Sequence, residues 1–195
     1  MDNNKTTNIL IVGVGGQGTI LASRILSYLA QEQGHDVKVS EIHGMAQRGG
    51  SVVTQVRMGQ KVYSPLIAEG QADMILAFER LEALRWMHYL KKGGTMIISD
   101  QAIEPTPVIM GLQKYPENII ARIRAKVPDT IAVDALSLAR KCGNDKVSNV
   151  VLMGVLARKM GFPKDKCIKA IEEKVPAKFL ELNKQAFEEG WNTEV

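Results

Sequence analysis

A glycine-rich stretch near the N-terminus limits the folds open to this chain more than any other feature of its sequence. Residues 9–12 (ILIV) are an apolar run, and residues 13–18 (GVGGQG) follow it with the spacing G-x-G-x-x-G. Behind them, apolar residues recur at helical spacing up to Gly34, which stands where a helix C-cap belongs. A strand covered on both faces, a glycine turn and a helix make the first unit of a Rossmann-like fold.

The backbone of this turn favours an anion. Glycine adopts angles that side chains forbid, and it lets another group approach the chain closely. The following helix directs unpaired N–H groups and the positive end of its dipole at the same place. Two interpretations stay open at this point: a site for a phosphate-bearing ligand, or a tight strand-to-helix corner without one.

A second unusual stretch follows the next predicted strand, residues 36–42 (DVKVSEI). Glu41 lies 23 positions beyond Gly18 (41 − 18), close to where a dinucleotide-binding fold carries its ribose-binding carboxylate. The chain then enters residues 43–50 (HGMAQRGG), which hold three glycines and little to bury. Arg48 in this loop can present its guanidinium to a phosphate or carboxylate, or the loop is only a turn with a solvated arginine.

The rest of the pattern predicts a single-domain, Rossmann-like α/β fold: an open, mostly parallel sheet with helices on both faces. A β-hairpin over residues 51–64 interrupts the βαβ order, residues 1–7 form a flexible tail, and residues 135–195 form a helical C-terminal part. Strands are expected at 72–78, 95–99, 108–110 and 130–133, with helices at 80–90, 119–126, 136–141, 149–160, 166–174 and 177–189. Gly93 and Gly190 are expected just beyond helix ends, Ser148 as an N-cap, and Asp100 as either a ligand-side carboxylate or an N-cap.

Composition excludes several classes of function. The net charge is +4, but the 25 lysines and arginines are scattered, so no nucleic-acid-binding face is predicted. Two cysteines without a C-x-x-C motif cannot supply the four thiolates of an iron–sulfur cluster. No nucleophile or paired carboxylate accompanies His43, so no catalytic residue is predicted. The absence of an apolar leader or a membrane-length apolar run predicts a cytoplasmic protein without a membrane partner.

Together, residues 13–18 (GVGGQG) and 41–50 (EIHGMAQRGG) resemble the gamma module of the 2-oxoacid:ferredoxin oxidoreductases, and most of all its indolepyruvate branch. The resemblance covers about residues 8–190. It implies a complex that oxidatively decarboxylates a 2-oxoacid, such as indolepyruvate or another arylpyruvate, to acyl-coenzyme A and reduces ferredoxin. It also implies thiamine diphosphate and iron–sulfur clusters on a large alpha subunit, while the gamma module binds coenzyme A.

By position, the resemblance assigns ligand-binding or intersubunit residues to both stretches and implies no metal ligand in this chain. Two alternatives stay open: a free-standing NAD- or FAD-dependent oxidoreductase that uses Glu41, and a purely structural subunit whose turn is empty. A homodimer of the isolated chain stays open as well. The implied cofactor-binding residues are Gly13, Gly15, Gly16, Gln17 and Gly18 in the turn, and His43, Gln47, Arg48, Gly49 and Gly50 in the loop.

Overall fold

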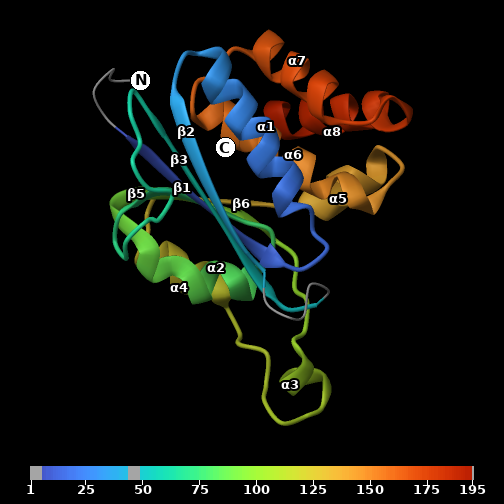
Figure 1. Cartoon of the computed structure of the whole chain (residues 1–195). Coiled ribbons are helices and arrows are strands. Elements are labelled where there is room, and N and C mark those ends of the chain that lie inside the picture. The colour runs from blue at the N-terminus through green and yellow to red at the C-terminus, as the bar shows by residue number, and fades with distance from the viewer. Residues whose placement is uncertain (1–5, 44–48, 195) are drawn as a thin grey trace.

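Figure 1 shows the computed structural model of the protein, which describes residues 6–43 and 49–194. A six-stranded sheet has the order β2-β3-β1-β4-β5-β6. Its strands are β1 (Thr7–Val14), β2 (Asp36–His43), β3 (Ser51–Gly59), β4 (Ala72–Ala77), β5 (Leu90–Ser99) and β6 (Thr130–Val133). The α-helices are α1 (Thr19–Glu32), α2 (Arg80–Trp86), α3 (Thr106–Ile109), α4 (Ile119–Arg124), α5 (Ala135–Lys141), α6 (Ser148–Lys159), α7 (Lys164–Lys174) and α8 (Leu180–Asn192). Short 3₁₀ turns occupy Met87–Tyr89, Asp145–Val147 and Ala177–Phe179.

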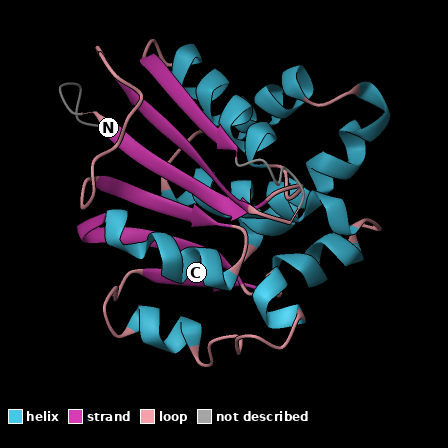
Figure 2. Ribbon diagram, turned by 60° about the horizontal axis from the view of Figure 1, so that its bottom comes forward, coloured by secondary structure: helices cyan, strands magenta, loops and turns pink. Residues whose placement is uncertain are grey.

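Helices cover both faces of the sheet, which confirms the predicted α/β class. Helices α1 and α5–α8 pack on one face, and α2 and α4 pack on the other (Figures 1 and 2). The apolar run in β1 contributes side chains to the hydrophobic cores on both faces of the sheet. Ile9 and Ile11 lie in the core beneath α1, whereas Leu10 and Val12 lie in the core beneath α2. All four side chains are fully buried, and this two-sided burial explains why the run contains no polar residue.

The predicted hairpin over residues 51–64 is wrong. Residues 51–59 form the single strand β3, which pairs antiparallel with β1 on one side and with β2 on the other. The hairpin is therefore β2–β3, and the second glycine-rich stretch connects its strands. Residues 60–66 form no strand; Arg57 Nη1 donates instead to the carbonyls of Ser64 and Leu66 at 2.9 and 3.1 Å. Most β3 side chains are buried, as an interior strand requires.

Two predictions around β5 also change. The helix predicted over residues 80–90 ends at Trp86, and Gly93 lies inside β5 instead of following that helix. Gly93 has a φ of +74°, and the register of β5 against β4 shifts, as in a β-bulge. The strand predicted over residues 108–110 is instead the end of α3 and its C-cap, because an early proline suits the start of a helix.

The C-terminal part follows the prediction with altered helix ends. Strand β6 occupies residues 130–133 as predicted, and helices dominate from Ala135 onward. Ser148 is the first residue of α6, and Val147 holds the N-cap position instead. Gly190 lies inside α8 rather than beyond it, because the backbone of α6 packs directly against it.

Candidate functional site

The glycine turn joins β1 to α1 at the carboxyl end of β1. Gly16 and Gly18 have φ values of +100° and +85°, which side chains rarely adopt. Gly18 is the N-cap of α1, and the first turn of that helix contains no acidic residue. Because a glycine cap has no side chain to accept from the first N–H groups of α1, these groups suit an anion.

The structure brings the two glycine-rich stretches into direct contact. The Gly15 N–H donates to the Gly50 carbonyl at 2.8 Å, and the Gly49 N–H donates to the Gly15 carbonyl at 3.3 Å. This contact extends the β1–β3 ladder, in which Val14 pairs with Ser51. Glycine backbone from both stretches thus lies together where β1 ends and α1 begins.

Some of the predicted site residues fall outside what the structure describes. His43 is the last residue of β2 and pairs with Val52, but its side chain is not among the described parts. Gln47 and Arg48 lie outside the described residues altogether. The other predicted site residues lie in or against the turn; they are Gly13, Gly15, Gly16, Gln17, Gly18, Gly49 and Gly50.

The Gln17 side chain fastens the ends of two neighbouring strands. Its Oε1 accepts from the Val14 N–H at 2.7 Å, and its Nε2 donates to the Phe78 carbonyl at 2.9 Å. Nε2 also donates to Gln101 Oε1 at 3.3 Å. Gly13 leaves room for this amide, because a Cβ there would lie 3.0 Å from Gln17 Oε1. Gln17 therefore shapes the turn through contacts within the protein.

Gln17→Ala is expected to lower the free energy of unfolding by about 2 kcal/mol, because two backbone groups lose their partner. Urea unfolding of the isolated chain, followed by circular dichroism, measures this value. Gln31→Ala, at an exposed position of α1, is the matched control and should change stability by less than about 0.5 kcal/mol. Equal effects of the two variants would show that the Gln17 amide does not fasten the turn.

A buried carboxylate anchors the end of the second glycine-rich stretch. Glu82 of α2 is 3% exposed and accepts from the hydroxyl of Ser51, the residue after Gly50. It also accepts from Arg85 Nη1 at 2.7 Å and from Trp86 Nε1 at 3.3 Å. Burial raises the pKa of the Glu82 carboxyl, although the Ser51 hydrogen bond and the Arg85 charge act in the opposite direction. This cluster, which the sequence pattern did not reveal, fixes the point where the stretch rejoins the sheet.

Glu41, the candidate ribose-binding carboxylate, lies one strand further from the glycine turn than a dinucleotide-binding fold would place it. Antiparallel β3 separates β2 from β1, whereas the ordinary order sets the second strand beside the first. Glu41 Oε1 accepts from Ser23 Oγ of α1 at 3.2 Å. This arrangement does not favour a nicotinamide or flavin dinucleotide.

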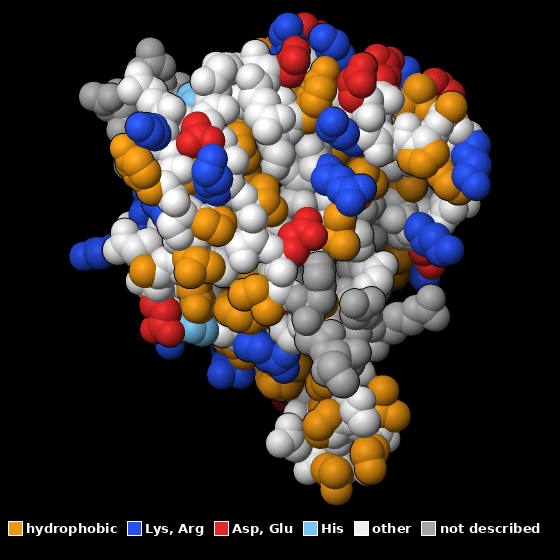
Figure 3. All heavy atoms as spheres, viewed as in Figure 1, with side chains coloured by type: hydrophobic (Ala, Val, Ile, Leu, Met, Phe, Trp, Pro, Cys, Tyr) orange, Lys and Arg blue, Asp and Glu red, His pale blue; other side chains and the backbone are white. Residues whose placement is uncertain are grey.

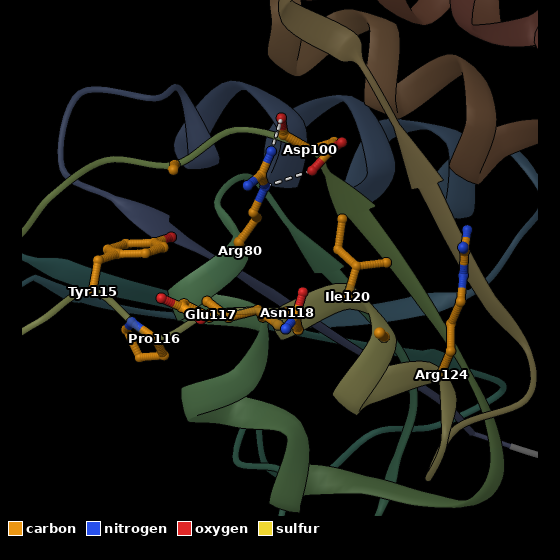
Figure 4. A pocket seen from close by; sticks show the side chains of 11 residues that line it. Arg80, Asp100, Tyr115, Pro116, Glu117, Asn118, Ile120 and Arg124 are labelled. Carbon is orange, nitrogen blue, oxygen red and sulfur yellow. Dashed lines mark hydrogen bonds and ion pairs between the residues drawn. The ribbon is translucent and has the colours of Figure 1, made fainter.

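A cavity of about 890 Å³ opens beside α4, near the carboxyl ends of β4 and β5 (Figure 4). Arg80 and Asp100 line it and form an ion pair, in which Arg80 Nε lies 2.5 Å from Asp100 Oδ1. Tyr115 and Arg124 lie at other parts of its wall. Asp100 is thus neutralised by a neighbouring cation, and it ties the segment after β5 to the start of α2.

Groups with redox or metal chemistry are sparse in the part of the chain that the structure describes. It contains no group of three or more His, Cys, Asp or Glu residues that could hold a metal ion. Cys142 and Cys167 are free thiols, and burial raises the pKa of the Cys167 thiol to about 12, which makes it a poor nucleophile. Among the described helices, none has the length and apolarity needed to cross a membrane.

Comparisons with known proteins agree over nearly the whole chain. The family described as pyruvate ferredoxin/flavodoxin oxidoreductase matches residues 8–193. Indolepyruvate oxidoreductase subunit IorB of Thermococcus kodakarensis is 42% identical over 193 residues, which cover 95% of each chain. The IorB subunit of Archaeoglobus fulgidus is 42% identical over 189 residues, or 95% of this chain and 94% of that protein. The crystal structure of a keto/oxoacid ferredoxin oxidoreductase gamma subunit from Geobacter sulfurreducens is 26% identical, with a TM-score of 0.70 and coverage of 95% and 96%.

Proposed function

Because this chain belongs to the pyruvate ferredoxin/flavodoxin oxidoreductase family, we propose that it is the small subunit of an indolepyruvate:ferredoxin oxidoreductase and binds coenzyme A there. The assembled enzyme oxidatively decarboxylates indolepyruvate or another arylpyruvate, forms the acyl-coenzyme A and passes electrons to ferredoxin. A large partner subunit carries thiamine diphosphate and the iron–sulfur clusters, and it breaks the carbon–carbon bond. The assembled enzyme is cytoplasmic. This chain supplies binding groups and no catalytic residue.

The backbone contact between Gly15 and Gly50 is the observation that carries this proposal. It sets two strips of bare backbone beside the glycine cap of α1, where N–H groups can reach a pyrophosphate. A Cβ added at Gly16 would meet nothing within 4 Å, so the turn offers open backbone. These donors fit the anionic half of coenzyme A, and Arg48, which precedes Gly49 in the sequence, is the charged donor that we assign to the same ligand.

Binding at this edge serves the reaction by positioning. Coenzyme A supplies the thiol that receives the acyl group. The first N–H groups of α1, which no cap side chain accepts from, and the Arg48 guanidinium hold its phosphates, which orients the thiol toward the partner subunit. Gln17 and Glu82 act indirectly, since they hold the two glycine-rich stretches in place.

Arg48→Gln is expected to raise the KM for coenzyme A at least about tenfold, because a charge-assisted hydrogen bond to phosphate is lost. The variant is co-expressed with the large subunit, and coenzyme A-dependent dye reduction with indolepyruvate is measured in the purified complex. The KM for indolepyruvate should change much less, since the partner subunit binds that substrate.

Arg122→Gln is the matched control, because Arg122 is an exposed arginine on α4, away from the glycine turn. It should leave the KM for coenzyme A unchanged. If both variants and the unmodified complex share one KM for coenzyme A, this edge does not bind the phosphates. Direct titration of the complex with coenzyme A by calorimetry measures the same loss of binding without turnover.

A further inference from the structure

The segment between β5 and α4 projects from the body of the protein. Its outer part, residues 104–114, is called the arm below and carries the short helix α3 (Figure 1). Three apolar side chains at its tip face solvent: Ile109, Met110 and Leu112 are 70%, 66% and 72% exposed. Figure 3 shows this tip as an apolar projection below the main body. In the part of the chain that the structure describes, nothing covers these side chains.

One buried carboxylate accepts hydrogen bonds from the residues at both ends of the arm. Glu79, only 1% exposed, caps α2 by accepting from the Glu82 N–H at 2.8 Å. Its other oxygen accepts from the Ile103 N–H at 3.1 Å and from the Tyr115 hydroxyl, which lie just before and just after the arm. Burial and the Glu79 carboxylate raise the pKa of the Tyr115 hydroxyl, so it remains a proton donor. The arm is therefore fixed at both ends.

The tip of the arm is folded as well as projecting. The N–H groups of Leu112 and Gln113 both donate to the Pro107 carbonyl, at 2.9 and 3.1 Å. These bonds hold the turn after α3 with its apolar side chains outward. An ordered apolar tip that does not pack on its own domain is typical of a surface that another protein covers.

We propose that the arm inserts its apolar tip into a groove of the large subunit that carries thiamine diphosphate. This inference rests on the proposed function and names the element that recognises the partner. The arm leaves the sheet after the carboxyl end of β5, and the glycine turn lies at the carboxyl end of β1, which is parallel to β4 and β5. A partner that meets the coenzyme A thiol at that edge is therefore also within reach of the arm.

The size of the tip argues against a dimer that two tips alone would hold together. Its three side chains expose on the order of 300 Å² of apolar surface, whereas a stable interface buries roughly 800 Å² on each partner. Two tips packed on each other would fall well short of that area. A larger subunit can cover the tip together with the neighbouring sheet edge and so reach the required area.

The test is a triple variant of the tip, Ile109→Ser/Met110→Ser/Leu112→Ser, bound to the large subunit in a surface-binding assay. The dissociation constant is expected to rise at least about tenfold, since buried apolar anchors dominate interface affinity. The melting temperature of the isolated subunit should stay unchanged, because the replaced side chains are exposed. If the triple variant does not fold, Leu112→Asp alone is measured in the same way.

The matched control replaces three other exposed apolar side chains: Tyr63→Ser/Leu66→Ser/Phe179→Ser. It should leave the dissociation constant unchanged. Equal constants for the tip variant, the control and the unmodified chain would overturn the proposal. A tip variant that instead converts a dimer of the isolated chain into a monomer would assign the tip to a second copy and overturn it too.

The two proposals fail separately. Loss of partner binding in the tip variant, with no effect of Arg48→Gln on the KM for coenzyme A, keeps the docking proposal and removes the coenzyme A assignment. An Arg48→Gln effect together with normal partner binding of the tip variant does the reverse.

Discussion

Gly190→Ala is expected to lower the free energy of unfolding by about 3 kcal/mol, because α8 and α6 cross with their backbones in contact. A Cβ at Gly190 would lie 1.8 Å from the Val151 carbonyl oxygen, which belongs to the α6 backbone and cannot rotate away. Gly154 marks the other side of the same crossing, since its Cβ would lie 2.3 Å from the Phe187 carbonyl oxygen. Urea unfolding of the isolated chain measures the loss.

Alanine is ordinarily the better helix former by about 1 kcal/mol, so a destabilised variant can only reflect the crossing. Gln185→Ala, at an exposed position of α8, is the control and should change stability by less than about 0.5 kcal/mol. A Gly190→Ala protein as stable as the unmodified chain would mean that the two helices pack with more space than the structure shows.

The parts of the fold that the sequence predicts best are those that one local signal decides. The run at residues 9–12 has no polar member, so burial on both faces follows, and β6 begins and ends where its β-formers do. Residues 51–59 carry an equally clear strand signal, but this signal does not indicate which strands they pair with, because the pairing depends on residues elsewhere in the chain. A Met-Gly-Gln sequence after Arg57 looks like a hairpin turn, although the strand actually pairs with β1 and β2.

In the candidate site, too, the features that local sequence decides could be predicted, and those that depend on distant contacts could not. The left-handed angles of Gly16 and Gly18 follow from the glycine motif itself. The contact between Gly15 and Gly50 depends on the insertion of β3 beside β1, and the sequence did not predict that insertion. The role of Glu82 is even harder to predict from sequence, because a buried carboxylate on a helix has the same sequence pattern as an exposed one. Only the contacts of Glu82 with Ser51, Arg85 and Trp86 show that it is a buried anchor.

Gly18→Ala is expected to lower the free energy of unfolding by about 3 kcal/mol, and two separate causes contribute. The position has a φ of +85°, which costs an alanine about 1 kcal/mol. The added Cβ would also lie 2.3 Å from Nδ2 of Asn149, whose side chain is only 5% exposed. That amide donates to the Gly18 carbonyl at 3.4 Å and accepts from the Val150 N–H at 2.9 Å in a buried hydrogen bond, so displacing it breaks both bonds.

Gly34→Ala separates these two causes. Gly34 has a similar φ of +79°, but a Cβ there would meet nothing within 4 Å, so only the backbone term of about 1 kcal/mol remains. In an Asn149→Ala background the collision partner is gone, and Gly18→Ala should then cost about as much as Gly34→Ala. If Gly18→Ala costs the same free energy of unfolding in the unmodified chain and in the Asn149→Ala variant, the Asn149 side chain does not restrict the space at Gly18. The expected coupling would mean that the contact between Asn149 of α6 and Gly18 sets the position of the α1 N-terminus. It would thereby also position the N–H groups that are proposed to bind phosphate.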